Sequence, residues 1–221
     1  MKRGLTVDVL FDLAHFRVHT TMKSRASYII PLPTTVIGFF FAILGKSREE
    51  YIKKRIMFKA GAKLLEIKGI CREYAQLLKL HSKWRERPQK STEELIILFR
   101  PKYRFAIWGS KETIDELYDR INEFSFEFVP YAGINDFIFF DVENPKLYNK
   151  YKEMDEIENT YLPQNLFSSL EMSENSIIYN LPYVYSGLPK TVIMGLNVKF
   201  KLKEKVSVIG GVPLYDCFLR L

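Results

Sequence analysis

The sequence is poor in the residues that build metal centres. It contains two cysteines, Cys71 and Cys217, and three histidines among 221 residues. The cysteines lack the short spacing of zinc ligands, and few histidines are left to complete a coordination sphere. We therefore expect no structural zinc and no other cofactor.

Long hydrophobic runs and phosphate-binding loops are also missing. The longest apolar stretch, residues 36–44, contains Gly38 and is about half the roughly 20 residues that a bilayer-spanning helix needs. No charged-then-apolar leader opens the sequence, so we expect a cytoplasmic protein without a membrane partner. Gly210 and Gly211 are not followed by the lysine and helix of a GxxxxGK loop, which argues against nucleotide hydrolysis.

Charge is abundant but unevenly distributed. The formal net charge is +7; residues 52–111 contain 16 Lys/Arg and 5 Asp/Glu, whereas residues 112–176 contain 4 and 15. This division is typical of two faces, one for a polyanion and one for a basic protein, solvent or a neighbouring subunit. The alternative is that both segments are solvated surface.

The N-terminal third has clear secondary-structure signals. Residues 5–13 alternate apolar and polar side chains, as in a half-buried strand. Prolines within residues 31–35 favour extended backbone, and a threonine there can cap a buried helix over residues 36–44. Ser47 and Glu50 have the spacing of a capping box, which predicts a second short helix.

The rest of the chain completes a recognisable order of elements. Strand patterns occur at residues 63–67, 95–99 and 103–107, and a further strand lies within residues 126–142. Between them, Ser110 caps a helix whose apolar positions are Ile114, Leu117, Ile121 and Phe124. Strand, helix, strand, strand, helix, strand is the order of the ferredoxin-like, RNA-recognition-motif fold. We predict an α+β protein with a ferredoxin-like domain over residues 1–142, a β-hairpin inserted at about 63–100, and a connecting segment with a β-rich C-terminal lobe over 143–221.

A row of lysines marks the C-terminal lobe. Lys199, Lys201, Lys203 and Lys205 alternate with apolar residues and lie on one side of a predicted strand. Exposed lysines commonly protect an edge strand from aggregation, and we interpret the row in this way.

The inserted hairpin carries a candidate RNA contact at its tip. Trp84 lies between Lys83 and Arg85 and close to Arg87. An aromatic ring beside cations is the combination with which proteins stack and neutralise single-stranded nucleic acid. The same tryptophan could dock onto another protein or have no role.

Two further basic groups are candidate RNA contacts. Between the first strand and the first helix lie Arg17, His19, Lys23 and Arg25, followed by Thr34 and Thr35, whose backbone N–H groups at a helix start can receive a phosphate. We add Arg100, Lys102 and Arg104, which flank and alternate with the apolar residues of a later strand. The alternative for the first group is a solvated loop.

Catalysis has weak support in the sequence. A metal-independent endoribonuclease needs a base with a pKa near neutrality, typically histidine, close to a second proton donor. His15 and His19 would share one face of an extended strand, and His81 stands in the inserted hairpin, where geometry is hard to hold. His19 and His81 are the catalytic candidates of this alternative; our expectation is no catalytic site.

Three segments resemble the Cas-five family of CRISPR-associated proteins. Residues 27–45, SYIIPLPTTVIG followed by FFFAILG, are similar to the family's N-terminal hallmark. Residues 129–137, VPYAGINDF, and residues 210–215, GGVPLY, are similar to later family segments. The resemblance implies a ferredoxin-like domain with a protruding thumb hairpin and a smaller β-rich C-terminal part, within the repeat-associated superfamily of RNA binders.

The resemblance also implies a function. Such proteins hold the repeat-derived 5′ handle of the guide RNA (crRNA) in type I Cascade complexes, contact the backbone and large subunits, and meet target DNA only indirectly. The inserted hairpin would be the thumb, and residues 17–25 with Thr34 and Thr35 would line the handle groove. The acidic segment would face a neighbouring subunit, which is our inference and not a family feature.

One branch of the family cleaves precursor crRNA with a tyrosine and an adjacent lysine-histidine pair. This sequence has no adjacent pair; Lys79-Leu80-His81 has the wrong spacing, and Tyr51 fits the tyrosine only loosely. We therefore expect a non-catalytic subunit. The alternatives are a precursor-processing endoribonuclease and a protein-interaction scaffold.

Overall fold

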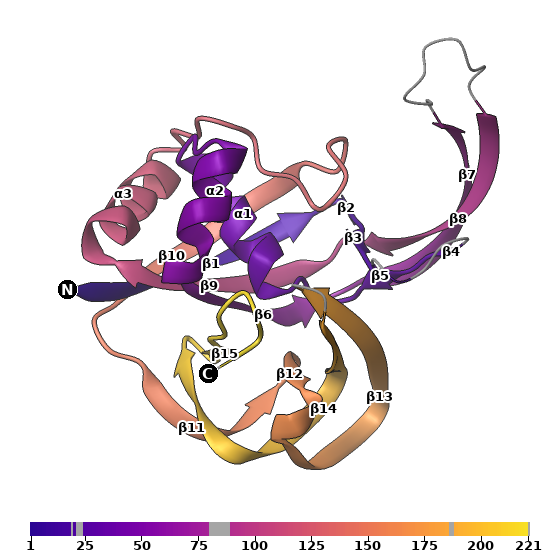
Figure 1. Ribbon diagram of the computed structural model, residues 1–221. Helices are drawn as coiled ribbons and strands as arrows, with labels where there is room; N and C mark the ends of the chain where they lie inside the picture. The colour runs from indigo at the N-terminus through magenta and orange to yellow at the C-terminus, as the bar shows by residue number, and fades with distance from the viewer. Residues whose placement is uncertain (19, 21–23, 80–88, 186–187, 221) are drawn as a thin grey trace.

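The protein is a mixed α/β structure made mostly of antiparallel strands (Figure 1). The computed structural model describes residues 1–18, 20, 24–79, 89–185 and 188–220. Its first sheet has the order β10-β1-β9-β6, and all three neighbouring pairs are antiparallel. The bounds are β1 Lys2–Phe11, β6 Lys59–Glu66, β9 Lys102–Ser110 and β10 Phe139–Tyr148. The predicted boundary at residue 143 falls inside β10.

Two layers cover the two faces of this sheet. Helices α1 (Pro33–Ile43) and α3 (Lys111–Asn122) lie on one face, and the C-terminal strands lie on the other (Figure 1). β1 was predicted to be half buried, and this prediction is wrong, because residues 4–9 are all buried. The alternating pattern predicted burial of the apolar side chains of β1, which face the helices. The polar side chains on the other face of β1 are buried as well, because the turn before β15 (Val212–Pro213) packs over them.

Local signals predicted the helices well, with one correction. Ser47 and Glu50 form the predicted capping box at the start of α2 (Arg48–Lys54), which a 3-10 turn, η1 (Arg55–Met57), extends. The predicted threonine cap of α1 is wrong: the helix begins at Pro33, and Leu32 makes no side-chain capping bond. Proline is favoured at the first helical position because its missing N–H has no intrahelical partner there.

The third helix follows its predicted pattern up to its end. Ser110 accepts a hydrogen bond from the Thr113 N–H, and the apolar positions Ile114, Leu117 and Ile121 are buried. Phe124 lies beyond the helix with φ of 52° and an exposed fraction of 61%. Assigning it to the buried face was therefore wrong, because the helix ends before it.

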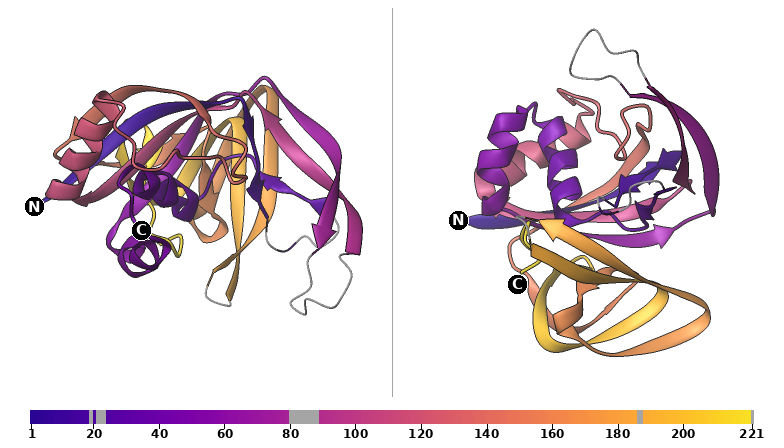
Figure 2. Two further views of the ribbon diagram at one scale, coloured as in Figure 1. Left: turned by 90° about the horizontal axis from the view of Figure 1, so that it is seen from above. Right: turned by 45° about the vertical axis from the view of Figure 1, so that its right-hand side comes forward.

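A long hairpin projects from the first sheet. β7 (Gly69–Lys79) and β8 (Gln89–Phe99) pair antiparallel, from Gly69 opposite Phe99 outwards. Figures 1 and 2 show this ribbon extending well away from the helices. Short strands brace its base: β2 (Leu13–Ala14) and β4 (Ser24–Arg25) pair with β8, and β3 (Phe16–Arg17) pairs with β5 (Ser27–Tyr28).

The C-terminal sheet is built around one central strand. β14 (Leu188–Ile209) pairs with β11 (Lys152–Glu158), β12 (Tyr161–Pro163), β13 (Phe167–Tyr185) and β15, and η2 (Gln164–Leu166) connects β12 to β13. The edge-strand interpretation of the lysine row is therefore wrong for Lys199 and Lys201, which pair with β11 on one side and β13 on the other.

Acidic residues of the neighbouring strands neutralise part of this row. Lys199 lies opposite both Glu158 and Glu171, and its Nζ is 2.6 Å from the Glu156 carboxylate. Opposite charges on adjacent strands attract one another. Part of the acidic segment is thus matched within the chain.

None of the helices in the described part of the chain has the length and apolar character that crossing a membrane requires.

Candidate nucleic-acid interface

Two of the predicted cations between β2 and α1, Arg17 and Arg25, lie on the short strands beside the hairpin. Arg17 is exposed on β3. Arg25 lies on β4, where its Nε is 2.5 Å from the Glu93 carboxylate of β8. Because the Glu93 side chain is only 6% exposed, Arg25 neutralises a buried charge partway along the hairpin, where Glu93 lies opposite Ala75.

A buried histidine ties three segments together at the same place. The His15 ring Nδ1 is 2.8 Å from the Ile96 carbonyl oxygen of β8, and its backbone N–H donates to the Ala132 carbonyl at 3.0 Å. Its Nε2 is buried and has no hydrogen-bond partner among the residues that the structure describes. Burial lowers the pKa of His15 below 6.5, and the nearby Arg25 and Arg17 lower it further. We therefore assign the neutral form, with Nδ1 donating to Ile96.

This burial predicts a loss of stability in mild acid. Below pH 6.5 the unfolded chain binds a proton at His15 that the folded chain resists, so the free energy of unfolding falls as pH falls, by up to about 1.4 kcal/mol per pH unit from this group. Urea unfolding between pH 7.5 and 5 would measure it. His15→Gln should flatten the pH dependence; an unchanged slope would show that other groups cause it.

The predicted cations after the hairpin have carboxylate partners within the chain. Arg100 lies 3.7 Å from an Asp12 oxygen, and the Lys102 Nζ lies 2.7 Å from Glu143. Their assignment to RNA stays a prediction.

Arg104 makes the strongest of these pairs. Its Nε and Nη2 are 2.6 and 2.8 Å from the two carboxylate oxygens of Asp8, whose side chain is 5% exposed. Arg104 Nη1 also donates to the Gly210 carbonyl at 3.4 Å. This contact places the guanidinium on the side of β9 that the C-terminal sheet covers, and its assignment to RNA also stays a prediction.

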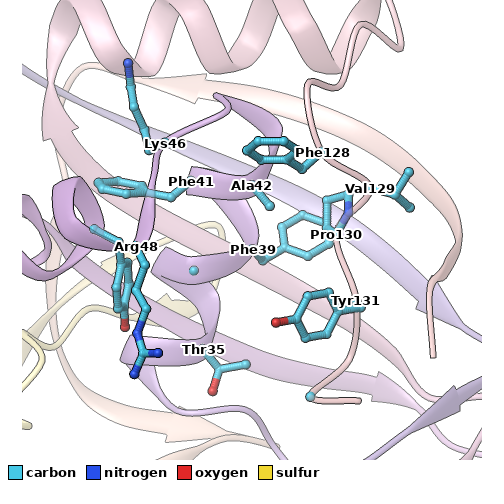
Figure 3. A pocket seen from close by; sticks show the side chains of 13 residues that line it. Thr35, Phe39, Phe41, Ala42, Lys46, Arg48, Phe128, Val129, Pro130 and Tyr131 are labelled. Carbon is cyan, nitrogen blue, oxygen red and sulfur yellow. The ribbon is translucent and has the colours of Figure 1, made fainter. Parts of the chain in front are cut away.

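The start of α1 forms one wall of a pocket of about 550 Å³ (Figure 3). Thr35 lines this pocket, and the Thr34 carbonyl accepts a hydrogen bond of 3.0 Å from the Tyr51 hydroxyl. Thr35 N–H donates to the Leu32 carbonyl, so it is already used inside the first turn. Of the two threonine N–H groups that were predicted to receive a phosphate, the N–H of Thr35 is therefore already hydrogen-bonded within the protein.

The opposite wall is the segment from Phe128 to Gly133. Gly133 has φ of 83°, and a Cβ there would lie 1.9 Å from the His15 carbonyl oxygen. This close approach seats the segment on the backbone just before β3. The pocket therefore brings together α1 and residues 128–133, two parts of the chain that are about ninety residues apart in sequence.

Other candidate residues were not foreseen. Lys46 and Arg48 line the pocket beside the exposed rings of Phe128 and Tyr131. On the hairpin, the side chain of Arg72 is 76% exposed, and Tyr74 is 73% exposed. An aromatic in a strand pattern is ordinarily assigned to the core, so sequence alone gives no signal of this exposure.

Several predicted residues lie outside the described residues. These are His19, Lys23, His81, Lys83, Trp84, Arg85 and Arg87. In the part of the chain that the structure describes, no group of three or more His, Cys, Asp or Glu side chains is arranged to hold a metal ion.

Comparison with known families finds a match in the N-terminal part of the chain. Residues 4–95 match the family model described as CRISPR-associated protein (Cas_Cas5). The matched residues include β1, α1 and most of the hairpin, and the match confirms the resemblance that the N-terminal motif predicted. The similarity to the Cas5 proteins is thus found in residues 4–95. No curated protein matches it in sequence.

Two solved structures share the fold. A "CRISPR protein from Archaeoglobus fulgidus" has a TM-score of 0.58 and 16% identity, with 97% of this chain and 99% of that chain covered. A chain of a "CRISPR RNA-guided surveillance complex" has a TM-score of 0.50 and 12% identity, with 93% and 91% covered. At these identities the similarity establishes the fold alone.

Proposed function

We propose that the protein is a non-catalytic subunit of a type I CRISPR interference (Cascade) complex that holds the 5′ handle of the crRNA and serves antiviral defence. The observation that carries this proposal is the family match over residues 4–95. The fold shared with a chain of an RNA-guided surveillance complex supports it. In this role the protein would contact the backbone and large subunits and meet target DNA only indirectly.

The architecture supports the finer assignment. The sheet order β10-β1-β9-β6, with α1 and α3 on one face, is the order expected of a ferredoxin-like domain. The β7–β8 hairpin corresponds to the proposed thumb, and the sheet around β14 to the β-rich C-terminal lobe.

The environment of His15 favours a non-catalytic role. Its Nε2 is enclosed, and its Nδ1 is bound to a backbone carbonyl, so the ring has no route to a phosphodiester. A two-histidine site that uses His15 is therefore disfavoured. The remaining alternative, an endoribonuclease that uses His19 or His81, is decided by experiment.

Incubation of the purified chain with labelled repeat RNA, without metal, tests the proposal. We expect the chain to retain repeat RNA more tightly than an unrelated RNA of equal length and to release no cleavage product. The logarithm of the association constant should fall linearly with the logarithm of salt concentration, by about 0.7 for each neutralised phosphate.

Two results would contradict the proposal. A single defined cut, abolished by His19→Ala or His81→Ala, would make the chain a processing enzyme. Equal retention of both RNAs would favour a protein-interaction scaffold.

A further inference from the structure

The pocket between α1 and residues 128–133 is lined by aromatic rings, of which those in residues 128–133 face solvent. Phe39 and Phe41 lie on the helix side and are buried, whereas Phe128 and Tyr131 lie on the other side (Figure 3). Tyr51 of α2 also belongs to the lining. Phe128 is 55% exposed and Tyr131 47% exposed. Exposed rings around a concave site are typical of surfaces that receive a flat or apolar group.

Two cations stand at this pocket, and together with the Ser47 N–H one of them, Lys46, helps to lower the pKa of the Glu50 carboxyl. Lys46 and Arg48 line it, and within the described residues neither forms an ion pair. No Asp or Glu is among the described residues that line the pocket. By contrast, Arg25, Lys102 and Arg104 each have a carboxylate within 3 Å. The charge of Lys46 and Arg48 is therefore available to an anionic group.

Gly38 lies in the middle of α1 at the wall of the same pocket. Glycine inside a helix destabilises it by about 1 kcal/mol relative to alanine. Neither conformation nor packing requires glycine here: its φ is not positive, and an added Cβ would meet nothing closer than the Tyr51 ring at 4.0 Å. Because Gly38 has no side chain, the backbone of α1 at this position is accessible to a group that enters the pocket.

We infer that this pocket takes one unstacked nucleotide of the bound RNA, with its base against the exposed rings of Phe128 and Tyr131 and the phosphates on either side of it at Lys46 and Arg48, whose charged ends point in opposite directions (Figure 3). The inference rests on the proposed function and adds where a base is held. Rings that stack a base beside cations that neutralise a phosphate are the combination used for single-stranded RNA. The Thr35 hydroxyl, also in the lining, offers a hydrogen bond to the base or sugar.

Gly38→Leu tests the inference because the new side chain would occupy the pocket. Gly38→Ala is the matched control, since it adds one methyl group in open space and favours the helix. In filter binding with repeat RNA, we expect Gly38→Ala to bind within about twofold of the wild type. We expect Gly38→Leu to bind at least about tenfold more weakly, the loss of one stacked base. Thermal unfolding of both variants would verify that they are folded.

Charge removal gives a second readout. The double variant Lys46→Ala/Arg48→Ala should lower the slope of log affinity against log salt by about 0.7 for each phosphate that the protein no longer neutralises. Lys53→Ala removes an exposed charge from α2 outside the pocket lining and should leave the slope unchanged.

Photo-crosslinking of 4-thiouridine-substituted repeat RNA should label residues 128–133.

The outcomes separate this inference from the proposed function. If wild-type protein does not prefer repeat RNA, the proposed function fails and the inference fails with it. If wild type prefers repeat RNA but Gly38→Leu binds equally well, only the inference is overturned. If Gly38→Leu retains RNA but no longer assembles with the other subunits of its complex, the occupant is a protein side chain, which also overturns the inference.

Discussion

Replacement of Arg104 by alanine should lower the free energy of unfolding by about 3–5 kcal/mol, although the sequence pattern predicted an RNA contact. The substitution leaves Asp8 buried between the sheet and the C-terminal strands. Among the described side chains, its one remaining hydrogen bond is that of 3.4 Å from the Asn144 amide. An uncompensated buried carboxylate is costly because it has lost its hydration without gaining an opposite charge. Urea unfolding at pH 7 would measure the change.

Two variants make this prediction specific. Lys102→Ala removes a neighbouring cation whose partner, Glu143, is 41% exposed, and it should cost no more than about 1 kcal/mol. The double replacement Asp8→Leu/Arg104→Met removes both charges and should recover much of the stability that Arg104→Ala loses. If Arg104→Ala keeps its unfolding midpoint but loses RNA affinity, Arg104 contacts RNA and the structural interpretation is wrong.

Signals that act over a few residues predicted the helices, whereas pairing between residues far apart in the chain could not be predicted from the residue pattern. The capping box at Ser47 and the cap at Ser110 involve partners three residues away, so the residue pattern contains the whole interaction. Arg104 and Asp8 are 96 positions apart, and nothing in either strand indicates the other as its partner. The lysine row was misinterpreted for the same reason, because the acidic strands beside Lys199 are remote in sequence.

The candidate site was predicted in part. Thr35 was singled out from the segment that resembles Cas5 proteins, and it does line the pocket. Phe128 and Tyr131 were not, since an aromatic residue in sequence is ordinarily a core residue, and only the tertiary path of residues 128–133 leaves these rings exposed. Lys46 and Arg48 were indistinguishable from other cations until the carboxylate partners of those others were known.

The substitution with the second large expected effect is Gly133→Ala, in residues 129–137, one of the three segments that resemble the family. Alanine in the left-handed conformation at φ of 83° costs about 1 kcal/mol. Its Cβ would also lie 1.9 Å from the His15 carbonyl oxygen, a backbone atom that cannot rotate away, and such overpacking costs about 2 kcal/mol more. The free energy of unfolding should therefore fall by about 3 kcal/mol in urea titration.

Gly211→Ala isolates the contribution of the close approach to His15. Gly211 has φ of 80°, but an added Cβ would meet nothing within 4 Å, so this variant should lose only about 1 kcal/mol. Equal losses in the two variants would mean that residues 128–133 move off the His15 backbone without cost. The expected result is a larger loss for Gly133→Ala, together with weaker retention of repeat RNA under conditions where the variant is still folded. It would show that the contact of residues 128–133 with the His15 backbone maintains the pocket wall formed by Phe128 and Tyr131.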